Sequence, residues 1–372
     1  MKIRDLKQGS KILGELPRGC KICDKGAKLV LLVTGLCGKR CFYCPLSEKK
    51  MGRDVIYANE MLIKTDKNKY ARKNDDEILD EAHKINALGT GITGGDPLTV
   101  IDRTVHFIEV LKNEFGEKHH IHLYTGNTPS KKDIERLADA GLDEIRFHPV
   151  PALWKNMEKG KFHDVLRNAL NTNMDIGVEV PSLPDFKKEL LILAKYLDDI
   201  SIDFLNLNEL EYSETNYLAL MKKGYKAKTD LSISVKGSEK TAIEIMKKAD
   251  INTLNIHYCS SSYKDAVQLK NRLGRRAKNV AHKYDIITKD NTLLKGAIEI
   301  PGADIRDLEK ALRIIVSDYN IPKQLVSIDN EKCRIEIASW ILEKIFKKIK
   351  YDCYIVEEYP TADRLEVERA PL

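Results

Sequence analysis

Short apolar runs alternate with helix-period segments over most of the chain, and this alternation constrains the fold more than any other feature. The expected strands are KLVLLVTG (28–35), GITGG (91–95), HIHLYTG (120–126), DEIRFHP (143–149), DIGVEVP (175–181) and DFLNLNE (203–209). The expected helices lie between them, at about 75–88, 100–115, 130–140, 161–172 and 185–198. Serial strand–helix units with short connections predict a parallel sheet covered by helices, and this many units predict a full or partial (β/α) barrel in an α/β fold.

The pattern changes after a basic segment, YKDAVQLKNRLGRRAKNVAHKY at 263–284, which we expect to be helical. This segment is either a solvated helix face or a surface that binds a phosphate backbone. The rest predicts strand 292–300, helix 304–318, strands near 324–328 and at 333–338, helix 339–349, and strands 351–359 and 364–369. The order β-α-β-β-α-β predicts a small ferredoxin-like α+β domain. We therefore divide the chain into an extension (1–27), a barrel (28–284) and a C-terminal domain (285–372).

The loop after the first expected strand carries Cys37, Cys41 and Cys44 in the spacing C-x3-C-x2-C. Three thiols are one fewer than a closed zinc or iron–sulfur site uses. Either a fourth ligand comes from elsewhere in the chain, or a group that is not protein takes the last coordination position. A structural zinc site is one interpretation, with Cys20 and Cys23 supplying a second pair of thiols.

Polar and glycine-rich segments also follow the later strands. They read GGDP (94–97), TGN (125–127), HPVP (148–151) and NELEYSE (208–214). In an α/β barrel the carboxyl ends of the strands meet at one mouth, where function resides. We therefore expect these segments and the cysteine loop to form one site.

Composition and segment hydrophobicity restrict the cellular compartment in which we expect this protein. The chain has 372 residues and a net charge of +6, which neither requires nor excludes an anionic partner. The N-terminus lacks the apolar segment of a signal peptide, and no run approaches the roughly 18 to 20 apolar residues of a membrane span. We expect a cytoplasmic protein without a membrane partner. In a reducing compartment, clustered cysteines favour metal binding over disulfides.

The C-x3-C-x2-C loop, with Tyr43 just before its third cysteine, and the GGDP segment together resemble the radical SAM superfamily. The chain is most similar to an archaeal-type group related to the activating enzymes of glycyl-radical proteins such as pyruvate formate-lyase, over about residues 28–260. The resemblance implies that Cys37, Cys41 and Cys44 hold a [4Fe–4S] cluster whose fourth iron is chelated by S-adenosylmethionine.

Further residues are assigned to the cofactor by the same resemblance. Gly94, Gly95, Asp96 and Pro97 would line its methionine end, although the family pattern usually carries Glu where this chain has Asp96. Tyr43 lies where the family holds the adenine, and Thr125 and Asn127 lie in a polar turn after the third strand of the barrel.

The activity that the resemblance implies is reductive cleavage of S-adenosylmethionine to a 5′-deoxyadenosyl radical, which abstracts hydrogen from a substrate. The cluster would receive its electron from a reductant such as ferredoxin or flavodoxin. The sequence leaves the substrate open among a small metabolite, a tRNA and a partner protein. The alternative is a non-catalytic iron–sulfur or zinc-binding protein, which would need neither the GGDP segment nor a barrel mouth.

Two residues on strands have competing interpretations. Glu179 shares a strand face with Gly177 and Pro181 and either contacts the cofactor ribose or pairs with Arg146 on the neighbouring strand. We favour the ion pair. His148 ends its strand and is either structural or a proton donor or substrate contact.

Three further cysteines could form a second metal site. We expect GCKICDKGAKLVLL (19–32) to form a hairpin with a turn at Asp24–Ala27, which would place Cys20 and Cys23 beside the first strand. Cys259 ends a later expected strand, INTLNIHYC (251–259), on the side of the mouth. Cys20, Cys23 and Cys259 therefore form a possible second site for an iron–sulfur cluster or zinc, and the alternative is an inert C-x2-C pair.

Overall fold

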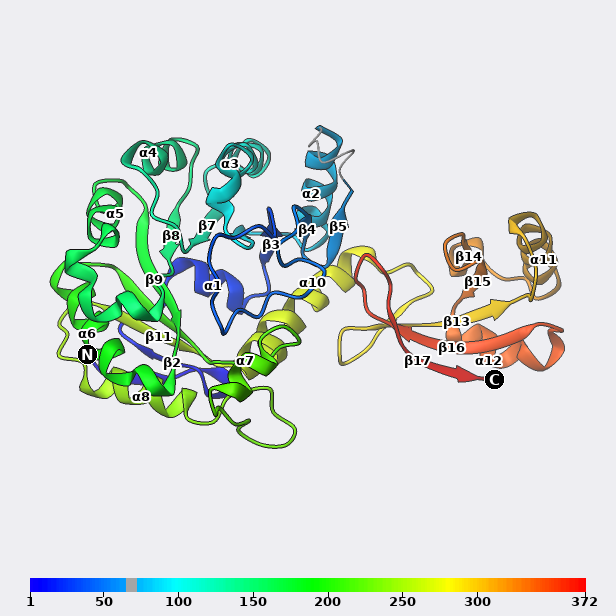
Figure 1. Ribbon diagram of the computed structural model, residues 1–372. Helices are drawn as coiled ribbons and strands as arrows, with labels where there is room; N and C mark the ends of the chain where they lie inside the picture. The colour runs from blue at the N-terminus through cyan, green and yellow to red at the C-terminus, as the bar shows by residue number, and fades with distance from the viewer. Residues whose placement is uncertain (65–71) are drawn as a thin grey trace. The chain divides into compact units, whose positions relative to one another are not determined.

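The computed structural model describes residues 1–64 and 72–372, which form two compact units (Figure 1). Unit 1 is Met1–Leu269 and unit 2 is Lys270–Leu372. The boundary that we drew from the sequence, near residue 285, falls inside unit 2. In the described parts of the chain, no helix has both the length and the apolar character needed to cross a bilayer.

Unit 1 is built on one mixed sheet whose central strands are parallel and follow one another in chain order. These strands are β3 (Lys28–Leu32), β6 (Gly89–Thr93), β7 (His120–Thr125), β8 (Glu144–Phe147), β9 (Asp175–Pro181), β10 (Phe204–Asn208) and β11 (Asn255–Cys259). Antiparallel pairs extend both edges: β2 (Lys11–Leu13) and β1 (Ile3–Asp5) beyond β11, and β4 (Ile56–Ala58) and β5 (Met61–Ile63) beyond β3. The predicted α/β architecture is confirmed. Closure into a full barrel is not observed among the described strands, because β1 and β5 remain edges.

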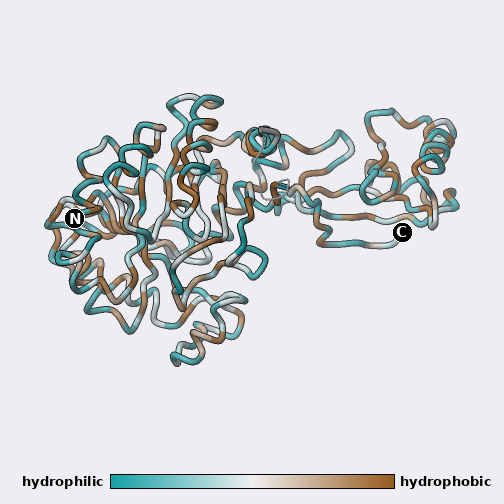
Figure 2. Tube along the Cα trace, turned by 45° about the horizontal axis from the view of Figure 1, so that its top comes forward, coloured by the Kyte–Doolittle hydropathy of each residue, from teal (hydrophilic) through white to brown (hydrophobic). Residues whose placement is uncertain are grey.

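In the described part of unit 1, five helices follow the strands as expected, with boundaries shifted by a few residues. They are α2 (Arg72–Lys84), α3 (Ile101–Phe115), α4 (Lys131–Asp139), α5 (Lys161–Ala169) and α6 (Lys187–Asp199). Helices α7 (Tyr217–Lys222) and α8 (Ser238–Lys248) lie between β10 and β11. The 3-10 segments are η1 (Lys7–Gly9), η2 (Pro97–Val100), η3 (Pro151–Lys159) and η4 (Pro184–Phe186). In Figure 2 hydrophobic positions (brown) recur along these helices between hydrophilic ones (teal), as expected for helices with one buried face.

Strand alternation gives the two faces of the sheet different characters. On β7 and β8, Ile121, Leu123, Ile145 and Phe147 are fully buried in the apolar core that the outer helices cover. The alternate positions of the same strands carry His120, His122, Tyr124, Glu144 and Arg146, so the opposite face is polar. The short helix α1 (Arg18–Asp24) packs on this polar face, against β6 and β7 (Figure 1).

The end of unit 1 is less regular than its central strands. The segment 228–236 makes two isolated bridges, Glu211 to Ser234 and Ala227 to Val235. The expected helix at 263–284 is confirmed as far as Val280. It is continuous over α9 (Ser261–Tyr263), a π-helical segment η5 (Lys264–Leu269) and α10 (Lys270–Val280), and α10 belongs to unit 2. Periodicity alone does not distinguish a π-helical turn from an α-helical one.

Unit 2 continues with β12 (Ile286–Ile287), β13 (Leu293–Glu299), α11 (Ile305–Asp318), η6 (Lys323–Leu325), β14 (Val326–Asp329), β15 (Arg334–Ile337), α12 (Ser339–Ile345), η7 (Phe346–Lys348), β16 (Asp352–Glu358) and β17 (Glu366–Pro371). The main strands are all antiparallel, in the order β14-β15-β13-β16-β17, and β12 pairs with β13. The chain order from β13 to β16 is the β-α-β-β-α-β order of the sequence, and the assignment to the ferredoxin-like class stays a prediction.

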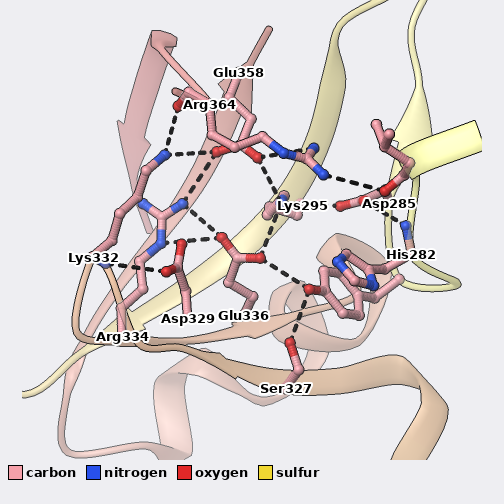
Figure 3. A network of polar contacts seen from close by, with 12 residues as sticks. His282, Asp285, Lys295, Ser327, Asp329, Lys332, Arg334, Glu336, Glu358 and Arg364 are labelled. Carbon is pink, nitrogen blue, oxygen red and sulfur yellow. Dashed lines mark hydrogen bonds and ion pairs between the residues drawn. The ribbon is translucent and has the colours of Figure 1, made fainter. Parts of the chain in front are cut away.

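The face of this sheet opposite α11 and α12 carries a buried ionic network (Figure 3). Lys295 Nζ lies 3.0 Å from Glu336 Oε2 and 2.8 Å from Glu358 Oε1, and Arg334 Nη2 lies 2.8 Å from Glu336 Oε1. The Tyr284 hydroxyl donates to Glu336 Oε2 at 3.0 Å. Because these charges are removed from water, the network stabilises unit 2 only while it stays fully paired.

Candidate active site

A cavity of about 660 Å³ opens among the loops that follow the parallel strands of unit 1. Of the residues singled out from the sequence, it brings together Cys37, Cys41, Tyr43, Cys44, Gly94, Gly95, Asp96, Thr125, His148 and Glu179. Pro97, Asn127, Cys20, Cys23 and Cys259 are not among its lining residues. Most of the loops that we expected to meet after the parallel strands therefore contribute residues to this cavity.

The cysteine loop is held to the mouth by contacts from the segment before α7. The amide of Asn216 donates to the carbonyl of Tyr43 at 3.2 Å, and the Thr215 hydroxyl donates to the carbonyl of Cys44 at 3.2 Å. Cys37 is exposed, whereas Cys41 and Cys44 are half-buried. The loop thus presents three thiols to the cavity from a backbone anchored at its far end.

The two glycines after β6 are required by a close approach of backbone to backbone. A Cβ on Gly94 would lie 2.4 Å from the carbonyl oxygen of Thr34, and one on Gly95 would lie 2.3 Å from that of Leu36. The N–H of Gly95 donates to Thr34 O at 2.8 Å, and that of Asp96 donates to Leu36 O at 2.8 Å. Only residues without a side chain allow this segment to lie against the start of the cysteine loop.

Asp96 is buried beneath the site, and its carboxylate links the GGDP segment to the turn after β7. Its carboxylate accepts hydrogen bonds from the N–H groups of Leu98 (3.0 Å), Gly126 (2.8 Å) and Asn127 (3.0 Å), and from the Thr125 hydroxyl (3.0 Å). Burial raises the pKa of Asp96, and these four donors oppose that rise. In the structure, Asp96, Thr125 and Asn127 therefore hold the GGDP segment to the turn after β7.

Tyr43 is fixed by a chain of hydrogen bonds that includes His148. His148 Nδ1 lies 2.7 Å from the backbone carbonyl of Glu179, which only accepts, so Nδ1 carries the proton. The other nitrogen, Nε2, then accepts from the Tyr43 hydroxyl at 2.9 Å. Burial lowers the pKa of His148, which favours this neutral form. His148 is a positioning residue for Tyr43, in agreement with the structural interpretation.

Glu179 forms the ion pair with Arg146 that we favoured, at 2.7 Å. Its carboxylate also accepts from the amides of Asn206 (2.9 Å) and Asn208 (2.8 Å). Burial alone would raise the pKa of Glu179, but Arg146 and the two amides hold it below its ordinary value. The cavity wall therefore carries an ionised carboxylate with fixed geometry.

The predicted hairpin at 19–32 was wrong, because Cys20 and Cys23 lie on helix α1. Gly26, which we took as a hairpin turn, has a φ of 61° and ends this helix instead. The thiol of Cys20 accepts weak contacts from Arg146 Nη2 and Asn206 Nδ2, both at 3.5 Å. Both side chains also bind Glu179, so Cys20 lies directly behind the cavity wall.

A second titratable cluster lies on the polar face of the sheet. His120, His122 and Glu144 are buried and present ligand atoms within 4.8 Å of one another. However, Lys28 Nζ lies 2.6 Å from His122 Nδ1, and Arg146 binds the Glu144 carboxylate. Lys28 and Arg146 therefore compete with a metal ion for His122 Nδ1 and Glu144 Oε1, whereas both ring nitrogens of His120 have no hydrogen-bond partner in the described part of the chain.

Several positioning residues were missed by the sequence interpretation. Asn206 and Asn208 fix Glu179, and Asn216 holds the cysteine loop. The two β10 asparagines alternate with buried leucines in FLNLN, so their polar face was visible in the sequence. Asn216 lies in a loop, and its contact depends entirely on tertiary structure.

Comparisons with known proteins agree with this site. Residues 31–149 match the radical SAM superfamily. A protein of Methanocaldococcus jannaschii is 44% identical over 370 residues, which cover 96% of this chain and 93% of the relative. The chain belongs to the radical SAM superfamily. The curated name of that relative assigns it, provisionally, to the glycyl-radical enzyme activating enzymes, and this radical SAM chain is related to that group.

The other comparisons add less. Residues 291–372, within unit 2 of this radical SAM enzyme, match a domain of unknown function, DUF8061. Among solved structures, methylornithine synthase is 11% identical over 59% of this chain and 62% of its own, with a TM-score of 0.38. A radical SAM methyltransferase from Sphaerobacter thermophilus is 14% identical over 67% of this chain and 69% of its own, also with a TM-score of 0.38. Such scores carry no argument about the details of the fold.

The donor set fits the cofactors of radical SAM enzymes better than it fits zinc. The cavity offers three thiols, which are soft ligands suited to iron–sulfur clusters. His148 lines the cavity, but Tyr43 and the Glu179 carbonyl engage both of its nitrogens, so it is not available as a fourth zinc ligand. The volume beyond the thiols leaves room for an organic ligand.

Proposed function

We propose that this radical SAM enzyme holds a [4Fe–4S] cluster on Cys37, Cys41 and Cys44 and binds S-adenosylmethionine in the rest of the cavity. The observation that carries the proposal is the single cavity that the three thiols share with Gly94, Gly95 and Glu179. When bound, these groups supply reductive cleavage of the sulfonium and a 5′-deoxyadenosyl radical that takes hydrogen from the substrate.

The residues of the chain contribute binding and orientation. Gly94 and Gly95 expose backbone to the cavity, and Asp96 sets their position from behind. Tyr43 presents its ring in the single orientation that His148 fixes, and Glu179 offers an ionised carboxylate to polar groups of the cofactor. Because Arg146 and the two asparagines hold this carboxylate, it does not have to reorganise when a ligand binds.

We further propose that the substrate is a glycine residue of a partner protein. Support comes from the name of the 44% identical relative, which refers to activation of a glycyl-radical enzyme. A small metabolite or a tRNA is the competing substrate class. The electron donor is proposed to be a reductant such as ferredoxin or flavodoxin. The eight cysteines form no disulfides in the structure, which suits a cytoplasmic enzyme with thiol ligands.

Anaerobic reconstitution followed by cofactor cleavage tests the proposal. The protein should take up about four irons per chain on these cysteines. With dithionite and S-adenosylmethionine alone, it should release 5′-deoxyadenosine and methionine. Cys41→Ala should abolish both iron binding at this site and product, whereas Cys333→Ala, at an exposed thiol of unit 2, should change neither. Tight zinc binding without iron uptake, or no deoxyadenosine from a fully loaded protein, would refute the proposal.

We also propose a second metal centre on Cys20, Cys23 and Cys259. Support comes from their placement: Cys20 and Cys259 are buried, and Asn206, which contacts Cys20, lies opposite His257 on the strand that ends at Cys259. The reconstituted protein should then hold about eight irons per chain, and the triple Cys→Ala variant about four. A count near four for the unmodified protein, without zinc, would leave the inert C-x2-C pair as the answer.

A further inference from the structure

An apolar patch surrounded by lysines lies beside the cysteine loop of unit 1. Its large side chains are Tyr217 (49% exposed), Leu218 (78%), Met221 (50%), Leu231 (100%) and Ile233 (51%). Most other exposed apolar residues of the described chain are separated along the sequence, whereas these five fall within 217–233. Exposed apolar clusters of this kind mark interaction surfaces.

Contacts through Tyr212 link three of the patch residues, Tyr217, Met221 and Ile233. The Tyr212 ring packs on Tyr217 with centroids 5.6 Å apart, and its hydroxyl lies 3.9 Å from the Met221 sulfur. The N–H of Tyr212 donates to the carbonyl of Ile233 at 2.7 Å. Tyr212 therefore contacts helix α7 through its side chain and the segment 229–235 through its backbone.

This patch is also joined to the cysteine loop. Lys223 Nζ lies 4.5 Å from the centre of the Phe42 ring, and Phe42 sits between Cys41 and Tyr43 in the sequence. Phe42 in turn stacks on Tyr225, just beyond α7, with centroids 6.4 Å apart. A partner seated on the patch would therefore lie next to the thiols.

Positive charge surrounds the apolar residues. Exposed lysines of the same segment are Lys222, Lys223, Lys226, Lys228 and Lys236, whereas nearby exposed acids are Glu214 and Asp230. Of these lysines, Lys228 is paired with Glu239 at 2.7 Å. Lys39 and Arg40 of the cysteine loop are exposed too. An apolar centre with a cationic rim fits a partner surface of the opposite charge, because rim charges steer association.

We propose that this surface, Tyr217 to Lys236, is the docking site of an acidic one-electron carrier protein that reduces the enzyme. The proposal rests on the function proposed above, since the donor gives up one electron and the cluster held by the thiolates accepts it. No bond forms or breaks in that step. Electron-transfer complexes are small and weak, which a patch of this size can satisfy.

The placement of α7 favours an electron donor over the polypeptide substrate. Thr215, Asn216 and Ala219 line the cavity, whereas Tyr217, Leu218 and Met221 are exposed on the outside of the same helical turn. A substrate must enter the cavity to reach the radical. A donor needs only to approach the loop from outside, where the patch lies.

The decisive variants change the surface without touching the cavity. Lys222→Glu with Lys226→Glu reverses two rim charges, and Leu218→Ser removes the most exposed large apolar side chain of α7. A matched control, Lys132→Glu with Lys188→Glu, makes the same change in net charge on the exposed faces of α4 and α6. All three proteins should fold, because these side chains are exposed.

Binding is measured first, by calorimetry with an acidic flavodoxin as the probe and without S-adenosylmethionine. The rim variant should weaken binding by about tenfold at low salt and much less at high salt. Leu218→Ser should weaken it by about fivefold, and the control should bind like the unmodified enzyme. In stopped-flow experiments, reduction of the reconstituted protein by the flavodoxin should be slowest for the rim variant, less slow for Leu218→Ser and unchanged for the control.

Dithionite separates this proposal from the proposed function. Cofactor cleavage driven by dithionite should be equal in the unmodified, patch and control proteins, because a small reductant needs no docking surface. Equal flavodoxin binding by all variants, or equal weakening by the control, would overturn the docking site. Loss of self-association in the patch variants would instead assign the surface to a second copy of the chain. Loss of substrate-dependent cleavage with dithionite would assign it to the substrate. If the unmodified enzyme forms no deoxyadenosine with dithionite, the proposed function fails, whatever the binding data show.

Discussion

Arg146 is the residue whose removal tests the structure of the site most directly. Its side chain is 2% exposed and binds two carboxylates, Glu179 at 2.7 Å and Glu144, whose own side chains are 14% and 0% exposed. Arg146→Met keeps much of the side-chain volume but leaves both acids without a cation. Breaking a buried pair in this way costs about 3–5 kcal/mol, which is two to four orders of magnitude in the unfolding equilibrium.

The pH dependence of this loss has a defined sign. In the unmodified protein the pKa of Glu179 is held below its ordinary value, so the pair contributes stability above the unfolded pKa of about 4.3 and loses it as the pH falls. The variant lacks this contribution. The two free energies of unfolding should therefore differ by a constant amount near neutral pH, and they should converge only as the pH falls below about 4.3, through the lowered pKa of Glu179 in the folded protein.

Urea unfolding of the cofactor-free protein measures this difference. The chain has two tryptophans, Trp154 in unit 1 and Trp340 in unit 2. A Trp340→Phe background makes the emission of Trp154, which is fully buried, report on unit 1 alone. The control, Arg167→Met on the exposed face of α5, should change stability by less than about 0.5 kcal/mol. A loss below about 1 kcal/mol for Arg146→Met that is independent of pH would refute the reasoning.

Two further predictions concern the cysteine loop and unit 2. Gly95→Ala should reduce bound iron per chain after reconstitution, because its Cβ would meet the carbonyl of Leu36 at 2.3 Å, whereas Gly38→Ala, with open space around it, should bind iron normally. Equal iron contents would contradict the packing argument. In unit 2, burial opposes ionisation of Glu336, but Lys295 and Arg334 lower its pKa to about 2 from 4.5. Stability followed by Trp340 should thus fall between pH 4.5 and 2, and Glu336→Gln should flatten that part of the profile.

The sequence predicted well those features that depend on local periodicity. The strand expected at 175–181 agrees with β9 residue for residue, because β-branched and other apolar residues bounded by turn signals are typical of a strand. The site followed from a rule of the fold class: loops after parallel strands converge. That rule is why Cys44, Gly95 and Thr125, far apart in the chain, were expected together and line one cavity.

The sequence-based predictions were wrong where one sequence pattern is compatible with two structures. Gly26 suits a hairpin turn and a helix end equally well, so the conformation of Cys20 and Cys23 could not be read from the chain. Edge pairing has no sequence signature that decides closure, so the sequence left a full and a partial barrel open, and the structure has open edges at β1 and β5.

By itself the sequence determined the alternating α/β plan of unit 1, the order of elements in unit 2 and the three thiols of the mouth, because hydrophobic period and ligand spacing are local properties. Only the tertiary structure decided what each polar side chain does. Asp96 holds the GGDP segment in place because three donors at the end of β7, from Thr125, Gly126 and Asn127, surround its carboxylate. Glu179 became a fixed anion because Arg146, Asn206 and Asn208 reach it from two neighbouring strands. The physical reason is that hydrogen-bond geometry and burial depend on distances between residues that lie far apart in the sequence.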